Sequence, residues 1–236
     1  MTSKRRWILM LTASAIGVFV ALKVAGPLLQ RSAVYPEPRG LPPVVSETTE
    51  QLLEQLQAAL ERKAPAVVQA LRPGLSAEQI AGLETAGGFR LSDDLRAIYR
   101  WHDGMVANAA VSLLPGHRFL PLQDVVNERT LIAKQAGAAT LAQQAAFEAF
   151  AGHRKQWLHV LDDGAGDGYF YDSNRTDAEG AFFFHFAEDG HYRWFPSFRN
   201  FLSGLVECYE TGSIKTGADG QSVDEDFERT EQIWGD

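Results

Sequence analysis

Hydrophobic residues in the first half of the chain recur at the spacing of an α-helix. Leu52, Leu56 and Leu60 share one face of a predicted helix. This helix should end before Pro65, because proline lacks a backbone donor and clashes with the preceding turn. The same spacing predicts a short second helix before Pro73, with Val67, Val68 and Leu71 as its apolar residues.

Capping residues mark the starts of two further helices. Ser76 and Gln79 form a capping-box pattern, in which each side chain satisfies the other residue's backbone N–H. A helix is therefore predicted to begin at Ala77, and Gly87-Gly88 can end it because glycine adopts left-handed dihedral angles at little cost. Ser92 is predicted to start the next helix, since the two aspartates after it favour the positive end of a helix dipole.

In the second half of the chain, short apolar or aromatic runs alternate with glycine and aspartate, which is typical of strands joined by tight turns. Strands are expected at Trp157–Leu161, Tyr169–Asp172 and Phe182–Phe186, with a further strand through Trp194. A closing helix is expected from Ser197, its N-cap, to Gly212. Its apolar face consists of Phe198, Phe201, Leu202, Leu205, Val206 and Tyr209.

The N-terminus is typical of a membrane anchor. A basic segment at 1–6, with Lys4-Arg5-Arg6, precedes an apolar run at 7–29 that is long enough to cross a hydrocarbon core of ~30 Å as a helix. Lys23 lies inside the run, and its long side chain can reach the lipid headgroups. Because basic residues stay in the cytoplasm, the rest of the chain is expected on the other side of an inner or plasma membrane, in the periplasm.

Two alternatives to the anchor stay open. A cleaved signal peptide has the same basic and apolar regions, and it would leave a soluble periplasmic domain. The uncleaved anchor is favoured, because no Ala-x-Ala site is evident before Pro27. A buried helical hairpin is the other alternative. Residues 30–47 are rich in proline and are expected to form a semi-extended linker.

Composition favours one globular domain with accessory segments, since 45% of the 236 residues are hydrophobic and 22% are charged. The net charge of −8 and the lack of a basic stripe argue against a nucleic-acid partner and favour a protein partner. Cys208 is the single cysteine, which excludes an intrachain disulfide and a cysteine metal cluster. Residues 216–236 form a polar, acidic tail, expected to be mobile unless Phe227, Ile233 or Trp234 docks it.

An acidic turn holds the most chemically suggestive residues. Asp162, Asp163 and Asp167 cluster between two predicted strands, and clustered carboxylates can bind Ca²⁺ or act in acid–base chemistry. The calcium-loop template fits poorly, because Ala165 and Asn174 occupy two of its ligand positions. Aspartate and glycine are also the residues that tight turns require. The interpretations are therefore a structural turn or an acidic loop that faces a partner.

Catalytic and metal-binding motifs are not found in the sequence. The six histidines lack a ligand spacing such as HExxH, and neither a nucleophile elbow nor a phosphate-binding loop occurs. The chain is therefore expected to be no enzyme, with no cofactor, no metal and no small-molecule substrate. Hydrolysis by Asp163 and Asp167 is the alternative. The dense aromatic residues of the predicted strands are expected to be core, although an aromatic ligand pocket is conceivable.

The order of these features resembles the SMI1/KNR4 family, also called the SUKH superfamily. The second half of the chain supplies the residues of the resemblance, which are Trp157, Gly166, Asp167, Asp172, Gly180, Phe198, Phe201 and Leu202. The first half adds Leu91-Ser-Asp-Asp-Leu95, Ile98-Tyr99 and a turn at Asp103-Gly104. The chain departs from the family pattern where Ser92 replaces a common proline and in an Ala/Gln-rich insert near residues 136–150.

The resemblance implies a fold and two functions. The fold is α+β, a single domain at 48–215 in which helices pack on a mixed or antiparallel sheet, preceded by the transmembrane helix. Bacterial members resemble immunity proteins that bind and neutralise a toxin, and fungal members resemble regulatory scaffolds of cell-wall synthesis. An immunity protein with Asp162, Asp163 and Asp167 in its partner-binding surface is the favoured reading. A membrane-tethered scaffold in envelope assembly is the alternative.

Overall fold

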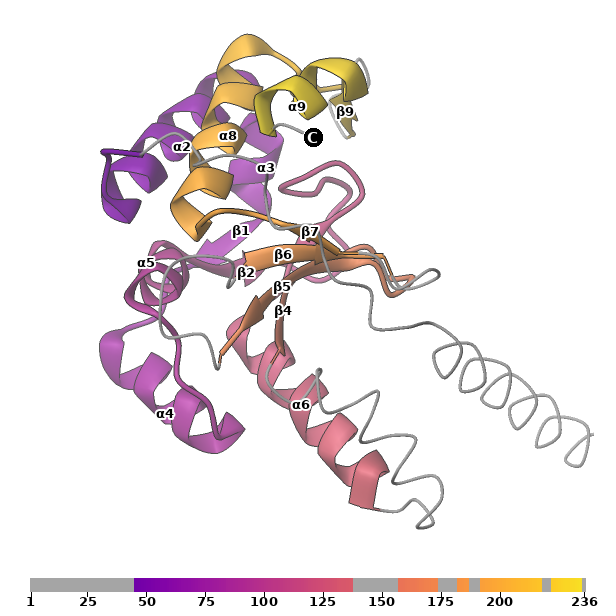
Figure 1. The fold of residues 1–236 in the computed structure, drawn as a ribbon. Coiled ribbons are helices and arrows are strands. Elements are labelled where there is room, and N and C mark those ends of the chain that lie inside the picture. Colours follow the sequence, from indigo (N-terminus) through magenta and orange to yellow (C-terminus); the bar gives the residue numbers. More distant parts are fainter. Residues whose placement is uncertain (1–44, 138–156, 174–181, 187–191, 218–221, 235–236) are drawn as a thin grey trace, which may run out of the picture. The chain divides into compact units, whose positions relative to one another are not determined.

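The computed structural model describes residues 45–137, 157–173, 182–186, 192–217 and 222–234 (Figure 1). No helix within these ranges is long and apolar enough to cross a membrane. The predicted anchor at 7–29 lies outside the described residues and stays a prediction. The same holds for most of the linker at 30–47, most of the insert near 136–150, and Gly180.

The first two helices follow the predicted pattern, and the second is shorter than expected. Helix α2 (Thr49–Lys63) begins after a capping box formed by Thr48 and Gln51, and α3 (Pro65–Ala70) begins at the proline that ends α2. Leu71 was expected in α3 but starts strand β1 (Leu71–Pro73), which pairs antiparallel with β2 (His102–Met105). The proline at the end of β1 favours this outcome, because the residue before a proline is driven into an extended conformation.

Helices α4 (Ala77–Gly87) and α5 (Asp93–Trp101) begin where the capping residues predict. The hydroxyl oxygens of Ser76 and Ser92 accept the backbone N–H of the third helical residue in each case. Gly88 ends α4 in the left-handed region, at φ +66°. The buried face of α5 includes Leu95, Ile98 and Tyr99. Asp103-Gly104, expected as a turn, lies instead inside β2.

The main sheet has five antiparallel strands in the order β3-β4-β5-β6-β7. The strands are β3 (Arg118–Phe119), β4 (Trp157–Asp162), β5 (Gly168–Asp172), β6 (Phe182–His185) and β7 (Tyr192–Trp194). The predicted α+β class with an antiparallel sheet and packed helices is therefore confirmed. Figure 1 shows α2, α3 and α8 (Phe198–Thr211) on one side of this sheet and α6 (Leu122–Gly137) on the other.

Strand alternation separates two cores on the sheet. Leu158, Tyr171 and Phe182 are paired across β4, β5 and β6, and they belong to the main core with Phe201 and Leu202 of α8. The neighbouring positions face the other way and form a small aromatic cluster of Trp157, Phe170 and Phe183. His159 stacks on Phe170 in this cluster, with ring centroids 4.2 Å apart. The family-pattern tryptophan thus lies in a buried cluster.

Further secondary structure follows α8 in the C-terminal segment. Strands β8 (Ile214–Thr216) and β9 (Val223–Glu225) form a hairpin, and α9 (Phe227–Trp234) follows. Of the three apolar tail residues, Ile233 and Trp234 pack against the main core, whereas Phe227 is 68% exposed. Part of the expected mobile tail is therefore a hairpin and a docked helix, because these two apolar residues give α9 a face to bury.

Candidate partner-binding groove

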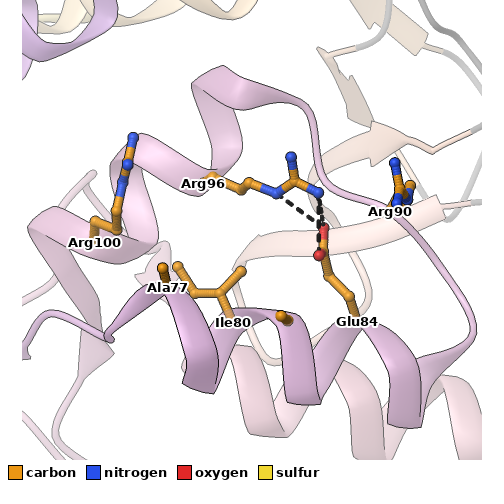
Figure 2. A pocket seen from close by; sticks show the side chains of 7 residues that line it. Ala77, Ile80, Glu84, Arg90, Arg96 and Arg100 are labelled. Atoms are coloured by element: carbon orange, nitrogen blue, oxygen red, sulfur yellow. Dashed lines mark hydrogen bonds and ion pairs between the residues drawn. The ribbon is translucent and has the colours of Figure 1, made fainter.

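Helices α4 and α5 face each other across a groove of about 350 Å³ (Figure 2). We call it the α4–α5 groove, and its lining consists of Ala77, Ile80, Ala81, Glu84, Arg90, Arg96 and Arg100. The four α4 residues recur at helical spacing, so they share one face of that helix. Arg96 and Arg100 are one turn apart on α5 for the same reason. Ser76 and Ser92 cap the starts of these two helices.

Glu84 joins the two helices inside the groove. Its Oε1 accepts the backbone N–H of Leu91 at 2.7 Å, and Nη2 of Arg96 donates to its two carboxylate oxygens at 2.9 and 3.1 Å. The glutamate is 8% exposed. A carboxylate buried to this degree is costly unless charged and backbone donors satisfy it, and here they do. The Glu84–Arg96 pair therefore links α4 to α5.

The three arginines of the groove differ in how far their charge is neutralised. Arg96 contacts Glu84 and, at 3.3 Å, Asp93. Arg100 reaches Glu50 at 3.6 Å, and both side chains are more than half exposed. Arg90 lies in the segment between the helices, is exposed, and forms no ion pair with any described residue. Figure 2 shows Arg96 reaching across to Glu84, with Arg100 and Arg90 on either side of it.

Sequence reasoning did not find this groove. The spacing of Arg96 and Arg100, four residues apart on the face opposite the Leu95 and Ile98 stripe, was the available signal. A pair of arginines on a helix is usually a solvated face, so that signal alone does not indicate a site. What makes the site is the contact between Arg96 and Glu84, which belong to different helices.

The acidic turn is a compact loop between β4 and β5. The Asp162 carboxylate accepts the N–H of Gly164 at 2.8 Å, and the Asp163 carboxylate accepts the N–H of Ala165 at 2.8 Å and of Gly166 at 2.9 Å. The backbone oxygen of Asp167 closes the loop by accepting the Asp163 N–H at 3.3 Å. These bonds between aspartate carboxylates and nearby backbone N–H groups are the ones that a structural turn requires. Asp163 and Asp167 are half-buried at the surface, so contact with a partner stays a prediction.

The other residues of the family pattern lie at separate places in the fold. Asp172 ends β5 opposite Trp157 of β4, and Phe198, Phe201 and Leu202 are buried on α8.

His159 lies 3.4 Å from the Glu128 carboxylate and 3.8 Å from the Asp162 carboxylate. No group of three or more histidine, cysteine or acidic side chains suited to a metal ion occurs in the part of the chain that the structure describes.

A polar cluster fastens the β1–β2 pair beside α5. The Asp103 carboxylate accepts the Leu122 N–H at 2.9 Å, which caps the start of α6, and it pairs with Arg72 at 3.0 Å. Burial raises the pKa of Asp103, although these two contacts oppose the shift. His102 lies 2.6 Å from the Arg72 carbonyl and 3.2 Å from Gln57, and burial lowers the pKa of its imidazole. Two of these four contacts are with backbone groups and two with side chains, so the cluster ties β1 and β2 to α2 and to the start of α6.

Cys208, the single cysteine, is fully buried on α8. Burial raises the pKa of its thiol to about 11. The thiolate is the nucleophilic form of cysteine, so this residue is inert at neutral pH.

These elements define an α+β domain in which a helical hairpin with a basic groove is held beside a five-stranded antiparallel sheet. Residues 74–204 match the model described as the SMI1 / KNR4 family (SUKH-1). The match covers more than half of the 236 residues, and the chain belongs to this family. The resemblance predicted from sequence is thus confirmed for the domain. Among curated proteins, no match to the chain was found.

Proposed function

We propose that this chain is a non-enzymatic protein-binding domain, and specifically an immunity protein that neutralises a toxin by direct binding. Membership of the SMI1/KNR4 (SUKH-1) family supports the proposal, because bacterial members of this family resemble immunity proteins. The matched residues include the whole α4–α5 groove. Neutralisation would work by occlusion, in which a preformed surface covers the active site of the toxin. Affinity in such complexes comes from a few buried anchors, while charge governs the association rate.

The acidic turn is the second proposed contact surface. Asp162, Asp163 and Asp167 carry negative charge at the end of the β4–β5 pair, where a basic region of a toxin can dock. The overall charge of −8 favours approach by such a region. Because Asp162 and Asp163 also hold the turn together, their contribution to binding must be separated from their contribution to folding.

A growth competition tests the immunity role before the toxin is known. In the organism that encodes the chain, deletion of its gene should leave growth in pure culture unchanged and make cells lose to the parent strain when the two are in contact. The full chain supplied in trans should restore survival. Slow growth or envelope defects in pure culture, with no loss in competition, would instead favour a membrane-tethered scaffold in envelope assembly.

The proposed location is a single-pass inner or plasma membrane protein with the domain in the periplasm. The basic residues before the apolar run at 7–29 support this orientation. Alkaline phosphatase fused after Ser46 should be active, and a fluorescent protein fused at the same residue should be dark. The opposite pattern would place the domain in the cytoplasm. If the apolar run is a cleaved signal peptide, the phosphatase fusion will be active but will appear in the soluble periplasmic fraction.

A further inference from the structure

The α4–α5 groove has more cationic groups than its own carboxylates neutralise. Three of its lining residues are arginines and one, Glu84, is acidic. Glu84 already accepts three hydrogen bonds from Arg96 and one from Leu91, so it has little capacity left for another cation. Asp93 and Glu50 lie outside the lining, at 3.3 Å from Arg96 and 3.6 Å from Arg100, and both are largely exposed.

Arg90 is the arginine of the groove that no carboxylate of the described residues pairs with. It lies in the segment between α4 and α5, and its exposed guanidinium forms no ion pair with the residues that the structure describes. A guanidinium offers a planar fork of donors that matches the two oxygens of a carboxylate. Arg100 can also offer its guanidinium to a carboxylate, because its contact with Glu50 is long, solvent-exposed and therefore weak.

The rest of the groove is apolar and small. Ala77, Ile80 and Ala81 line the α4 side; Ala77 and Ala81 are exposed there, whereas Ile80 is 2% exposed and belongs to the core. A volume of about 350 Å³ lies at the lower end of the range for ligand sites, so the groove suits one or two side chains rather than a whole helix. Its chemistry fits a carboxylate between arginines with an aliphatic group next to it.

We propose that the α4–α5 groove binds an acidic loop of the protein partner, with an aspartate or glutamate side chain held by Arg90 and Arg100 and an aliphatic neighbour packed on Ala77 and Ala81. The inference rests on the proposed function, because a protein-binding domain is needed to supply such a partner. The groove would bind an acidic region of the partner, whereas the acidic turn would bind a basic one. The partner would then present an acidic loop to the groove, whatever charge it offers elsewhere.

Titration of the full chain with a defined peptide tests the chemistry of the groove. The probe is a Leu-Glu-Leu-Glu peptide with blocked ends, and the readout is the side-chain Nε–H resonances of Arg90, Arg96 and Arg100 in a nuclear magnetic resonance spectrum. We expect saturable shifts at Arg90 and Arg100 that disappear at about 0.5 M salt, where charge interactions are strongly screened. A Leu-Lys-Leu-Lys peptide should cause no shift. Shifts with inorganic phosphate but not with the acidic peptide would overturn the proposal.

Charge reversal supplies the matched variants. Arg90→Glu should weaken binding of the acidic peptide by about tenfold or more, since it replaces a fork of donors with a like charge. Arg229→Glu makes the same change in net charge at an exposed position of α9, outside the groove, and should bind as the unaltered chain does. Arg90→Gln removes the cation without adding a carboxylate and should give an intermediate loss. Equal binding by all three variants would overturn the proposal.

The growth competition separates this inference from the proposed function. If deletion of the gene causes no sensitivity to the parent strain, the immunity role fails, and the peptide titration alone decides the groove. If deletion causes sensitivity, the Arg229→Glu chain should restore survival and the Arg90→Glu chain should not. Restoration by both chains would keep the immunity role and exclude the groove from it.

Discussion

Trp234 lies flat on Phe201, with ring centroids 5.6 Å apart and planes 6° apart, and its indole N–H donates a hydrogen bond to the Phe201 carbonyl at 3.2 Å. This contact joins α9 to α8. Gly204 makes it possible, because a Cβ at that position would lie 2.0 Å from the indole nitrogen. Trp234 is therefore the aromatic anchor of α9, and its indole fills the space that Gly204 leaves open.

Removing this anchor should destabilise the domain measurably. We expect Trp234→Ala to lower the free energy of unfolding by about 1–3 kcal/mol, less than for a fully buried tryptophan because the side chain is half-buried. Phe227→Ala is the control on the same helix, and it should change stability by less than about 0.5 kcal/mol because Phe227 is exposed. Urea unfolding followed by circular dichroism measures both, and a loss for Trp234→Ala as small as that for Phe227→Ala would mean that Trp234 contributes no docking energy.

The sequence predicted where α4, α5 and α8 begin because caps are local. Ser76, Ser92 and Ser197 each bond a backbone N–H three residues later, so the information lies within one turn. The two strands β1 and β2 were missed, because each has four residues or fewer and forms only when Leu71 meets Met105. Short runs of this kind have no periodicity of their own to read.

The candidate site was less predictable than the fold for a similar reason. The α4–α5 groove depends on Arg96 reaching Glu84, twelve residues earlier in the chain and on another helix. The acidic turn was visible because its three aspartates lie within six residues. The groove could therefore be found only once the positions of α4 and α5 were known.

Gly104 is a second position where the backbone requires glycine. Its φ is +70°, and a Cβ there would lie 2.3 Å from the backbone nitrogen of Pro121. Gly104→Ala should cost about 2–4 kcal/mol, from the left-handed conformation and the clash together. Gly88→Ala is the matched control, because Gly88 also has positive φ but no atom lies within 4 Å of its Cβ position.

The comparison of the two glycine variants isolates the clash. Gly88→Ala should cost about 1 kcal/mol, the conformational cost alone. Thermal melting of both variants gives the difference. If Gly104→Ala were no worse than Gly88→Ala, the close approach of β2 to the Leu120–Pro121 backbone would not exist in solution.

His102 should make stability depend on pH. Burial lowers the pKa of its imidazole below the ordinary 6.5, so the unfolded chain takes up a proton at a higher pH than the folded chain. The stability that His102 contributes is therefore present above about pH 6.5 and is lost as pH falls through the folded-state pKa. The slope from one such group is at most about 1.4 kcal/mol per pH unit.

Urea unfolding at about pH 7.5 and pH 5.5 tests this, with His102→Gln as the comparison. The unaltered chain should lose more stability between the two pH values than the variant does. Asp103, whose pKa burial raises, acts in the opposite direction, because the folded state holds its proton more tightly. Asp103 is present in both proteins, so its effect largely cancels when their losses of stability are compared. Equal losses would show that His102 is not buried as described.

Asp163 allows the two roles of the acidic turn to be separated. Its carboxylate accepts two backbone N–H groups, from Ala165 and Gly166. Asp163→Ala removes both acceptors and should lower the free energy of unfolding by about 1–2 kcal/mol. Asp163→Asn keeps an acceptor oxygen in the same place and removes the charge, so stability should change by about 0.5 kcal/mol or less.

The Asp163→Asn chain therefore tests binding with folding held constant. If the turn contacts a basic region of the partner, this chain should fail to restore survival in the growth competition while unfolding at the same urea concentration as the unaltered chain. A chain that survives competition as Asp163→Asn but fails as Asp163→Ala would assign the aspartate to the turn alone. The acidic turn would then shape the end of the β4–β5 pair, and the partner surface would have to be sought at the α4–α5 groove.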